Sequence, residues 1–347
     1  MRVMRKSMTV WGLLAIVLVV ALAAVACDSE EATTTTTAET TDTTAAASEM
    51  ITVGITQIAA HPALDACAQG FKDALADGGY VEGENVTFDM QDAQGDPANG
   101  TLIAQKFVGD GVDMIFAIAT PTAQAAVNET DGMDLPVIFG AITDPVAAEL
   151  LTNADAPEAN VTGASDKLPL QPHLDLIMDL VPDAKTIGLL YNAGETNSVV
   201  LVEEEKTLAA AMGLEVVEAT AANTSEVLAA AQSLVGRVDA ISVLTDNTVV
   251  EAFESVVQVC EENDIPLVAG DIDSVERGAV AAWAFDYYNH GYQAGQMAVR
   301  VLDGAAISDV PVEFAKELKL AINTTAAEAM GITIPDDLVD QADSTFE

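Results

Sequence analysis

VDMIFAIATP, residues 112–121, and VDAISVLTDN, residues 238–247, are two versions of one pattern. Each begins with Val-Asp, continues as an apolar run and ends in polar residues, which is typical of a buried strand that leads into a helix. A strand that is apolar throughout is covered on both faces, as the strands of a parallel sheet are. The pair therefore predicts an α/β protein whose two halves are built alike.

The likeness between the two halves extends along most of the chain. From Ile51 apolar strands alternate with amphipathic helices, and the same order starts again at Lys185. Matching residues lie at nearly constant offsets, which are 134 from Gly54 to Gly188, 126 from Asp113 to Asp239 and 130 from Pro136 to Pro266. A repeat of this length indicates a pair of domains rather than a solenoid. We therefore expect two similar, doubly wound parallel-sheet lobes joined by a multi-strand hinge.

The end of the chain predicts that each lobe is completed by a later segment. A helix over 286–304 and a strand over 318–323 would return the chain first to one lobe and then to the other. Several connections of this kind make a hinge. The predicted divisions are a signal peptide at 1–26, a tether at 27–50, lobe I at 51–165 plus about 287–312, and lobe II at 166–286 plus about 313–347.

The N-terminus resembles a bacterial lipoprotein signal. A charged start precedes the apolar run 10–22, and AAVAC places small residues before Cys27. The resemblance implies cleavage before Cys27 and acylation of that cysteine, hence an extracytoplasmic protein that lipid anchors to the cell membrane. An uncleaved membrane helix is the alternative. Residues 28–49 are rich in Thr, Ala and acidic residues without an apolar period, which predicts a disordered tether.

The chain is strongly acidic. It has 347 residues, of which 13 are basic and 55 acidic, for a formal charge of −42. Such a surface repels phosphates, so nucleic acid is excluded as a partner. The acidity also suggests adaptation to high salt, a hypothesis that fails if added salt does not stabilise the protein against unfolding.

Cysteine and histidine show no pattern of metal or redox chemistry. Cys67 and Cys260 lie on apolar helical faces, so we expect two buried small side chains rather than a disulfide. His61, His173 and His290 lack metal-ligand spacing and are expected to be solvated or capping residues. The sequence contains no nucleophile elbow and no phosphate loop. We therefore expect neither an enzyme nor a bound cofactor or metal.

Polar residues follow nearly every predicted strand. In open parallel sheets, ligands bind beyond the carboxyl ends of the strands. The candidate ligand-binding residues are Gln57, His61, Thr120, Thr143, Asp144, Tyr191, Asn192, Thr196, Asn197, Thr245, Asp246, Asn247 and Asp271. Helix capping is the alternative for any one of them, but six polar loops on two facing lobes favour a cleft. For Trp283 and Tyr287 the sequence leaves two roles open, which are stacking on a ligand and packing in the core or hinge.

Several segments together resemble one family, the substrate-binding lipoproteins of ABC importers of the tryptophan/tyrosine-type group. These segments are HPALDACAQGFKDALADGGYVEGENV, GDPAN, ATPTAQAA, TDPV, NVTGASD, YNAGETNS, TDNTVV, DSVERGA and DYYNHGYQAG. The resemblance runs from about Ile51 to Ile334 and implies the fold of type I periplasmic binding proteins. It also implies a small zwitterionic ligand, an amino acid and perhaps an aromatic one, that is delivered to a membrane permease and its ATPase.

The resemblance implies roles for single residues. Thr120 and Thr143 would bind the ligand carboxylate, Asp271 its ammonium group, and Tyr191, Asn197, Asp246 and Asn247 would line the wall of lobe II. Ala193-Gly194 departs from the Pro-Ser that is usual in the family, which leaves the ligand open. A sensory binding protein that reports a ligand to a membrane receptor has the same sequence features. An extracellular hydrolase is a third alternative, which the absence of a nucleophile motif argues against.

Overall fold

A computed structural model describes residues 50–347, which form one compact unit. The signal peptide, the Cys27 lipid site and nearly all of the tether predicted from the sequence lie outside the described residues. Within these residues, no helix has both the length and the apolar character needed to cross a bilayer.

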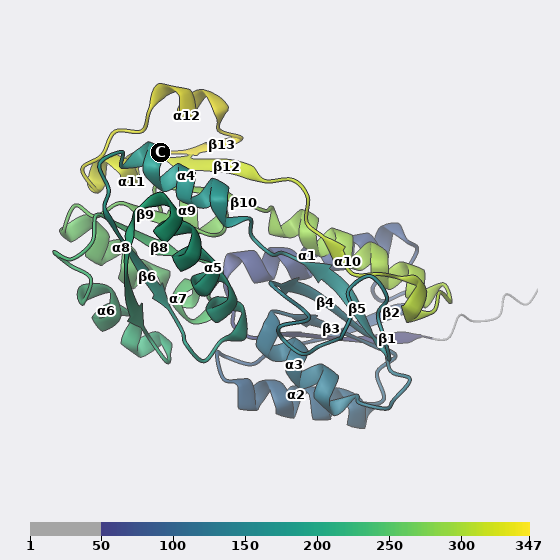
Figure 1. Cartoon of the computed structure of the whole chain (residues 1–347). Helices are drawn as coiled ribbons and strands as arrows, with labels where there is room; N and C mark the ends of the chain where they lie inside the picture. The colour runs from purple at the N-terminus through teal and green to yellow at the C-terminus, as the bar shows by residue number, and fades with distance from the viewer. Residues whose placement is uncertain (1–49) are drawn as a thin grey trace, which may run out of the picture. The chain divides into compact units, whose positions relative to one another are not determined.

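Two sheets organise the fold (Figure 1). The six-stranded sheet has the order β11-β5-β4-β3-β1-β2 and is parallel throughout. Its strands are β1 Ile51–Gln57, β2 Val86–Asp92, β3 Met114–Ile118, β4 Val137–Ile142, β5 Val161–Ser165 and β11 Glu313–Phe314. Its helices are α1 Pro62–Asp77, α2 Pro97–Asp110, α3 Thr120–Glu129 and α10 Tyr287–Leu302.

The seven-stranded sheet has the order β13-β12-β10-β9-β8-β6-β7, and only the pair β10–β12 is antiparallel. Its strands are β6 Thr186–Tyr191, β7 Glu215–Thr220, β8 Ala240–Val243, β9 Leu267–Ala269, β10 Ala281–Ala284, β12 Lys319–Asn323 and β13 Ser344–Phe346. The helices of this half are α4 Leu170–Leu180, α5 Thr196–Met212, α6 Thr224–Gln232, α7 Asn247–Glu251, α8 Phe253–Glu262, α9 Asp273–Glu276, α11 Thr324–Ala329 and α12 Asp336–Gln341. A short 3-10 turn at Ile307–Asp309 follows α10.

The predicted α/β class with two similar halves is confirmed. The order β2-β1-β3-β4-β5 of one sheet is repeated as β7-β6-β8-β9-β10 in the other. Their central strands β3 and β8 are fully buried, as the two quoted segments predicted. Cys67 and Cys260 are free and buried, which confirms that they form no disulfide.

The chain crosses between the halves at three places, after β5, after β10 and between β11 and β12. Helix α10 therefore follows a strand of the seven-stranded sheet but packs against α1 of the six-stranded one. At this contact the two backbones are close, because a Cβ built on Gly291 would lie 1.9 Å from the Cys67 carbonyl oxygen. The predicted residue boundaries of two separate lobes stay a prediction, since the described residues 50–347 group as one compact unit.

The histidines differ from the sequence expectation. His173 on α4 and His290 on α10 are buried rather than solvated, and neither caps a helix. The ring of His290 accepts a hydrogen bond from the backbone N–H of Ala141 at 3.0 Å, which ties α10 to β4. Sequence pattern did not show this, because the partner lies 149 residues away.

A polar cluster lies inside the core of the seven-stranded half. The Ser242 hydroxyl donates to Glu205 Oε2 at 3.3 Å and lies 2.8 Å from His173 Nε2. Burial raises the pKa of Glu205 to about 8 and lowers the pKa of His173 to about 4. Both side chains are therefore uncharged at neutral pH, which is how a core holds ionisable groups without an ion pair.

This cluster predicts a pH dependence of stability. A glutamate whose pKa is raised on folding stabilises the protein below its unfolded pKa of about 4.5, and this stability is lost as pH rises towards 8. Between pH 6.5 and 8, urea titrations should show the wild-type unfolding free energy fall by about 2 kcal/mol. Glu205→Gln should remove most of this fall. Glu204→Gln, which changes the partly exposed neighbour on α5, is the control and should keep this fall. Equal falls in both variants would contradict the assignment.

Candidate functional site

A narrow cavity lies where the carboxyl ends of the strands of both sheets meet. Seven of its lining residues belong to the six-stranded half: His61, Ala63, Leu64, Ala141, Thr143, Asp166 and Tyr287. The other six belong to the seven-stranded half: Asn197, Thr245, Asp246, Asn247, Val250 and Asp271. The space open to the centre of a water molecule is about 20 Å³, enough for about one water molecule. An organic ligand therefore requires the walls to move apart.

The structure brings together seven of the thirteen predicted site residues in this cavity. They are His61, Thr143, Asn197, Thr245, Asp246, Asn247 and Asp271. Asn192 and Thr196 line a second cavity of about 580 Å³, which shares Asn247 with the first. Gln57, Thr120, Asp144 and Tyr191 line neither cavity. These placements do not test the ligand-binding roles, which stay predictions.

The four residues that line neither cavity have other surroundings. Gln57 is buried and its amide donates to Asp65 at 3.0 Å. Thr120 is buried at the start of α3, and its hydroxyl has no partner in the described part of the chain. The Tyr191 hydroxyl donates to Glu218 at 2.7 Å, and burial together with this carboxylate raises the tyrosine pKa to about 12.

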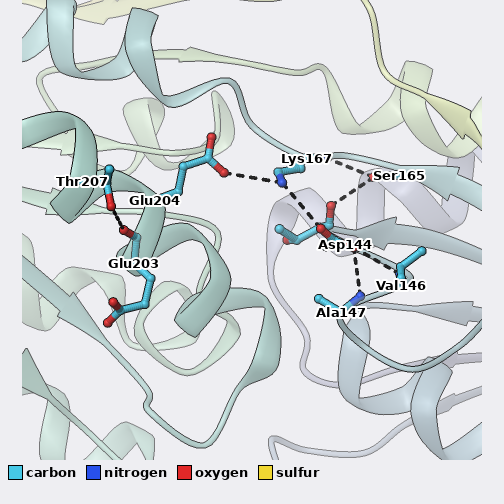
Figure 2. Close-up of polar contacts among 9 residues, drawn as sticks. Asp144, Val146, Ala147, Ser165, Lys167, Glu203, Glu204 and Thr207 are labelled. Carbon is cyan, nitrogen blue, oxygen red and sulfur yellow. Dashed lines mark hydrogen bonds and ion pairs between the residues drawn. The ribbon is translucent and has the colours of Figure 1, made fainter. Parts of the chain in front are cut away.

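Asp144 belongs to a contact that joins the two halves (Figure 2). Its Oδ1 accepts the backbone N–H groups of Val146 and Ala147, while its Oδ2 lies 3.5 Å from the Lys167 ammonium. The same ammonium lies 3.4 Å from Glu204 on α5. Lys167 thus connects the end of β4 with a helix of the other half, through a partly exposed network that salt screens.

The loop Thr245–Thr248 is held by its own buried network. Asp246 caps α7 by accepting the N–H of Val249, and its Oδ2 accepts the N–H of Asn192 and the hydroxyl of Ser198, both at 2.6 Å. Asn247 and Thr248 both donate to the Glu195 carboxylate. Capping therefore accounts for much of this polar loop, as the alternative proposed, although three of its residues also line the cavity.

Several polar atoms in the cavity wall have no partner among the described residues. They are both ring nitrogens of His61, Oδ1 of Asp166, Oδ1 of Asn197 and Oγ1 of Thr245. Buried polar atoms in native proteins are almost always hydrogen-bonded, because an unmade bond costs about 1–3 kcal/mol. Five such atoms, which come from both halves, lie in the wall of this one cavity, where a polar ligand would satisfy them.

Charge in the cavity is unbalanced. Asp166, Asp246 and Asp271 line it, whereas no lysine or arginine of residues 50–347 does. Burial raises the pKa of Asp166 and Asp271, and burial together with the Glu195 carboxylate raises that of Asp246 to about 7. Burial and Arg277 lower the pKa of His61 to about 4, so its ring is neutral at pH 7.

Two polar residues of the cavity wall, Asp166 and Tyr287, were not among the predicted site residues. Asp166 directly follows β5, a strand too short and too mixed in composition to be recognised from its apolar pattern. The rule of strand ends would have indicated Asp166 once that strand was known. Tyr287 lies in the wall of the cavity, whereas Trp283 in β10 packs against the core of the seven-stranded half.

Among residues 50–347 no group of His, Cys, Asp and Glu side chains is arranged to hold a metal ion.

Comparison with known proteins relates the fold and the cavity to other chains. Residues 52–346 match the family described as ABC transporter substrate binding protein. A tyrosine-binding protein of Clostridioides difficile is 42% identical over 80% of each chain. An ABC domain from Streptococcus pneumoniae in complex with L-Trp is 36% identical, with a TM-score of 0.82 over 86% of this chain and 100% of that one. A substrate-binding protein with adhesive properties from Clostridium difficile, in its ligand-free, open form, is 39% identical with the same coverage and a TM-score of 0.65.

Proposed function

The chain belongs to the family of ABC transporter substrate-binding proteins, and from this premise we propose that it binds an aromatic amino acid in this narrow cavity and delivers it for import. Proteins of this family are extracytoplasmic and bind solutes rather than catalyse reactions. The observation that carries the proposal is the set of unpartnered polar atoms from both halves in one cavity.

The composition of the cavity wall suits an amino acid. Polar atoms of His61, Asp166 and Thr245 would satisfy the charged end of the ligand. Apolar side chains of the same wall, among them Leu64 and Val250, would cover its side chain. The names of the two relatives support an aromatic ligand, since one is called tyrosine-binding and the other holds L-Trp.

The binding step would be a closure of two lobes. The cavity is nearly filled by its own walls, so a ligand must enter an opened form. The fold is more similar to the relative in complex with L-Trp than to the relative in a ligand-free, open form, by TM-scores of 0.82 and 0.65. We therefore propose that the six-stranded and seven-stranded halves move as lobes about the three crossings of the chain. Their bounds lie close to the predicted 51–165 with 287–312 and 166–286 with 313–347, except that Asp166 and β11, which pairs with β5, move with the six-stranded half.

The remaining parts of the proposal concern the membrane. A lipid on Cys27 would anchor the protein, residues 28–49 would act as the tether, and the closed form would deliver its ligand to a permease and ATPase. Mass spectrometry of the mature N-terminus tests the anchor: an unmodified residue 27 would contradict it.

Thermal unfolding with added amino acids tests the function. A ligand that binds only the folded protein at 100 times its Kd adds about 2.7 kcal/mol to the unfolding free energy. Tyrosine or tryptophan should then raise the Tm by about 5 °C or more. Glucose serves as a control and should leave the Tm unchanged. If none of the twenty amino acids shifts the Tm, the protein is not an amino-acid binder.

A further inference from the structure

Three carboxylates in the cavity, without a lysine or arginine in its wall, favour a ligand that carries a positive charge. Two of these three carboxylates already accept hydrogen bonds from the protein at both of their oxygens. Asp246 accepts three hydrogen bonds within the 245–249 turn and from its neighbours. Asp271 caps the following turn, because its two oxygens accept the N–H of Ser274 at 2.8 Å and the hydroxyl of Ser274 at 2.6 Å.

Asp166 is the carboxylate with an oxygen left over. Only 2% of this residue is exposed. Its Oδ2 accepts the hydroxyl of Tyr287 at 2.5 Å, while its Oδ1 has no partner among residues 50–347. Both residues line the cavity, Asp166 from the end of β5 and Tyr287 from the first turn of α10.

An ammonium group matches this free oxygen. It is a compact cation with three N–H donors, and a charge-assisted hydrogen bond to a carboxylate is about twice as strong as a neutral one. Binding it would satisfy the buried Oδ1 and balance the charge of a carboxylate that would otherwise be buried alone. Neutral His61 and the hydroxyl of Thr245 cannot supply this charge balance from the protein side.

We propose that Asp166 binds the ammonium group of the ligand through Oδ1, and that Tyr287 is a positioning residue that holds Oδ2 and so directs Oδ1 towards the ligand. The inference rests on the proposed function and deepens it. It makes a primary ammonium group the feature that the site selects. It also differs from the prediction from sequence resemblance, which assigned this role to Asp271.

The test compares L-tyrosine with 3-(4-hydroxyphenyl)propionate, which is the same molecule without the amino group. Titration calorimetry should show that wild type binds tyrosine at least 100-fold more tightly than this analogue. Asp166→Asn should weaken tyrosine binding about 100-fold and change binding of the analogue less than threefold, because only tyrosine loses a charged partner. Asp179→Asn, the same change on the exposed face of α4, is the control and should bind as wild type does.

Two further variants keep the result decisive. Tyr287→Phe retains the ring, so it should fold and should still lose about tenfold in tyrosine affinity without loss for the analogue. Asp271→Asn should lower the affinity for tyrosine by a smaller factor than Asp166→Asn does. The reverse order would overturn the proposal.

Other outcomes separate this inference from the function beneath it. Asp166→Asn with wild-type affinity for tyrosine, or with equal losses for both molecules, overturns the role of Asp166 and leaves the proposed function intact. A wild-type protein that binds no amino acid overturns both.

Discussion

Gly291→Ala should cost at least about 3 kcal/mol of unfolding free energy, a large part of the 5–15 kcal/mol that stabilises a typical protein. Gly291 on α10 faces α1, and an added Cβ would lie 1.9 Å from the carbonyl oxygen of Cys67. On the other side of the same contact, a Cβ on Gly70 would lie 2.0 Å from the carbonyl oxygen of Tyr288. These obstacles are backbone atoms, so a change of side-chain rotamer cannot relieve them and the helices must separate.

Separation of α1 and α10 is expensive because the contact holds much of the core. The ring of Phe71 on α1 stacks on Phe116 of β3 at a centroid distance of 3.8 Å, and both side chains are fully buried. Overpacking of a tight core costs about 1–3 kcal/mol and occasionally more. We expect the upper end here, where main chain meets main chain.

Gly109→Ala is the matched control for this prediction. Gly109 lies in α2, where an added Cβ meets no atom within 4 Å. Alanine should stabilise the helix there by up to about 1 kcal/mol, since glycine loses more backbone freedom on folding. Urea unfolding should therefore move the two variants in opposite directions. Equal stability of Gly291→Ala and wild type would show that α1 and α10 do not pack at this distance.

Asp246→Ala is expected to have an effect of similar size, a loss of about 3–5 kcal/mol of unfolding free energy. The carboxylate is 1% exposed and accepts hydrogen bonds from the N–H of Asn192, the hydroxyl of Ser198 and the N–H of Val249. Alanine would leave these three donors without an acceptor, and each buried unmade bond costs about 1–3 kcal/mol. Relaxation of the loop and entry of water would recover part of the sum.

Asp96→Ala supplies the comparison for Asp246. Asp96 is also an N-cap, but it lies at the exposed start of α2 and accepts a single bond, from the N–H of Ala98 at 2.8 Å. Loss of an exposed cap costs about 1 kcal/mol. If denaturant titration gives similar losses for both variants, the buried network around Asp246 does not hold the turn as described.

Together these residues show what positions the proposed ligand site. Asp246 and Glu195 fix the turn that brings Thr245 and Asn247 to the cavity, and the contact of α10 with α1 places Tyr287 beside Asp166. Five of the buried polar atoms without a partner among residues 50–347 belong to side chains that line the cavity. A ligand would therefore complete a hydrogen-bond network that the protein leaves open.

Much of the fold could be predicted from the sequence because its signals are local. The apolar runs that became β3 and β8, and the helices that follow them, are set by side-chain periodicity over about ten residues. The repeat of these signals predicted two sheets with one strand order. The positions of polar residues after strands placed seven of thirteen candidates in one cavity, because parallel strands end on the same side.

Local pattern failed where a residue depends on distant partners. It predicted solvated or capping histidines, whereas His173 is buried beside Ser242, 69 residues away. It passed over β5, whose five residues show little apolar pattern yet are fully buried between β4 and β11. It could not separate capping from ligand binding at Asp246, since both roles favour the same residue type at a helix start.

The sequence by itself determined the class of the fold, its internal repeat and the edge of each sheet at which polar residues gather, since all three follow from the order of apolar and polar residues along the chain. Only the tertiary structure decided which buried polar atoms are hydrogen-bonded within the protein and which have no partner there. Asp166 and Tyr287 are 121 residues apart, yet their hydrogen bond occupies one carboxylate oxygen of a cavity-lining residue and leaves the other without a partner among residues 50–347. The hydrogen bond between Tyr287 and Asp166 depends on where the chain returns to the six-stranded half after β10. No stretch of neighbouring residues in the sequence encodes that return.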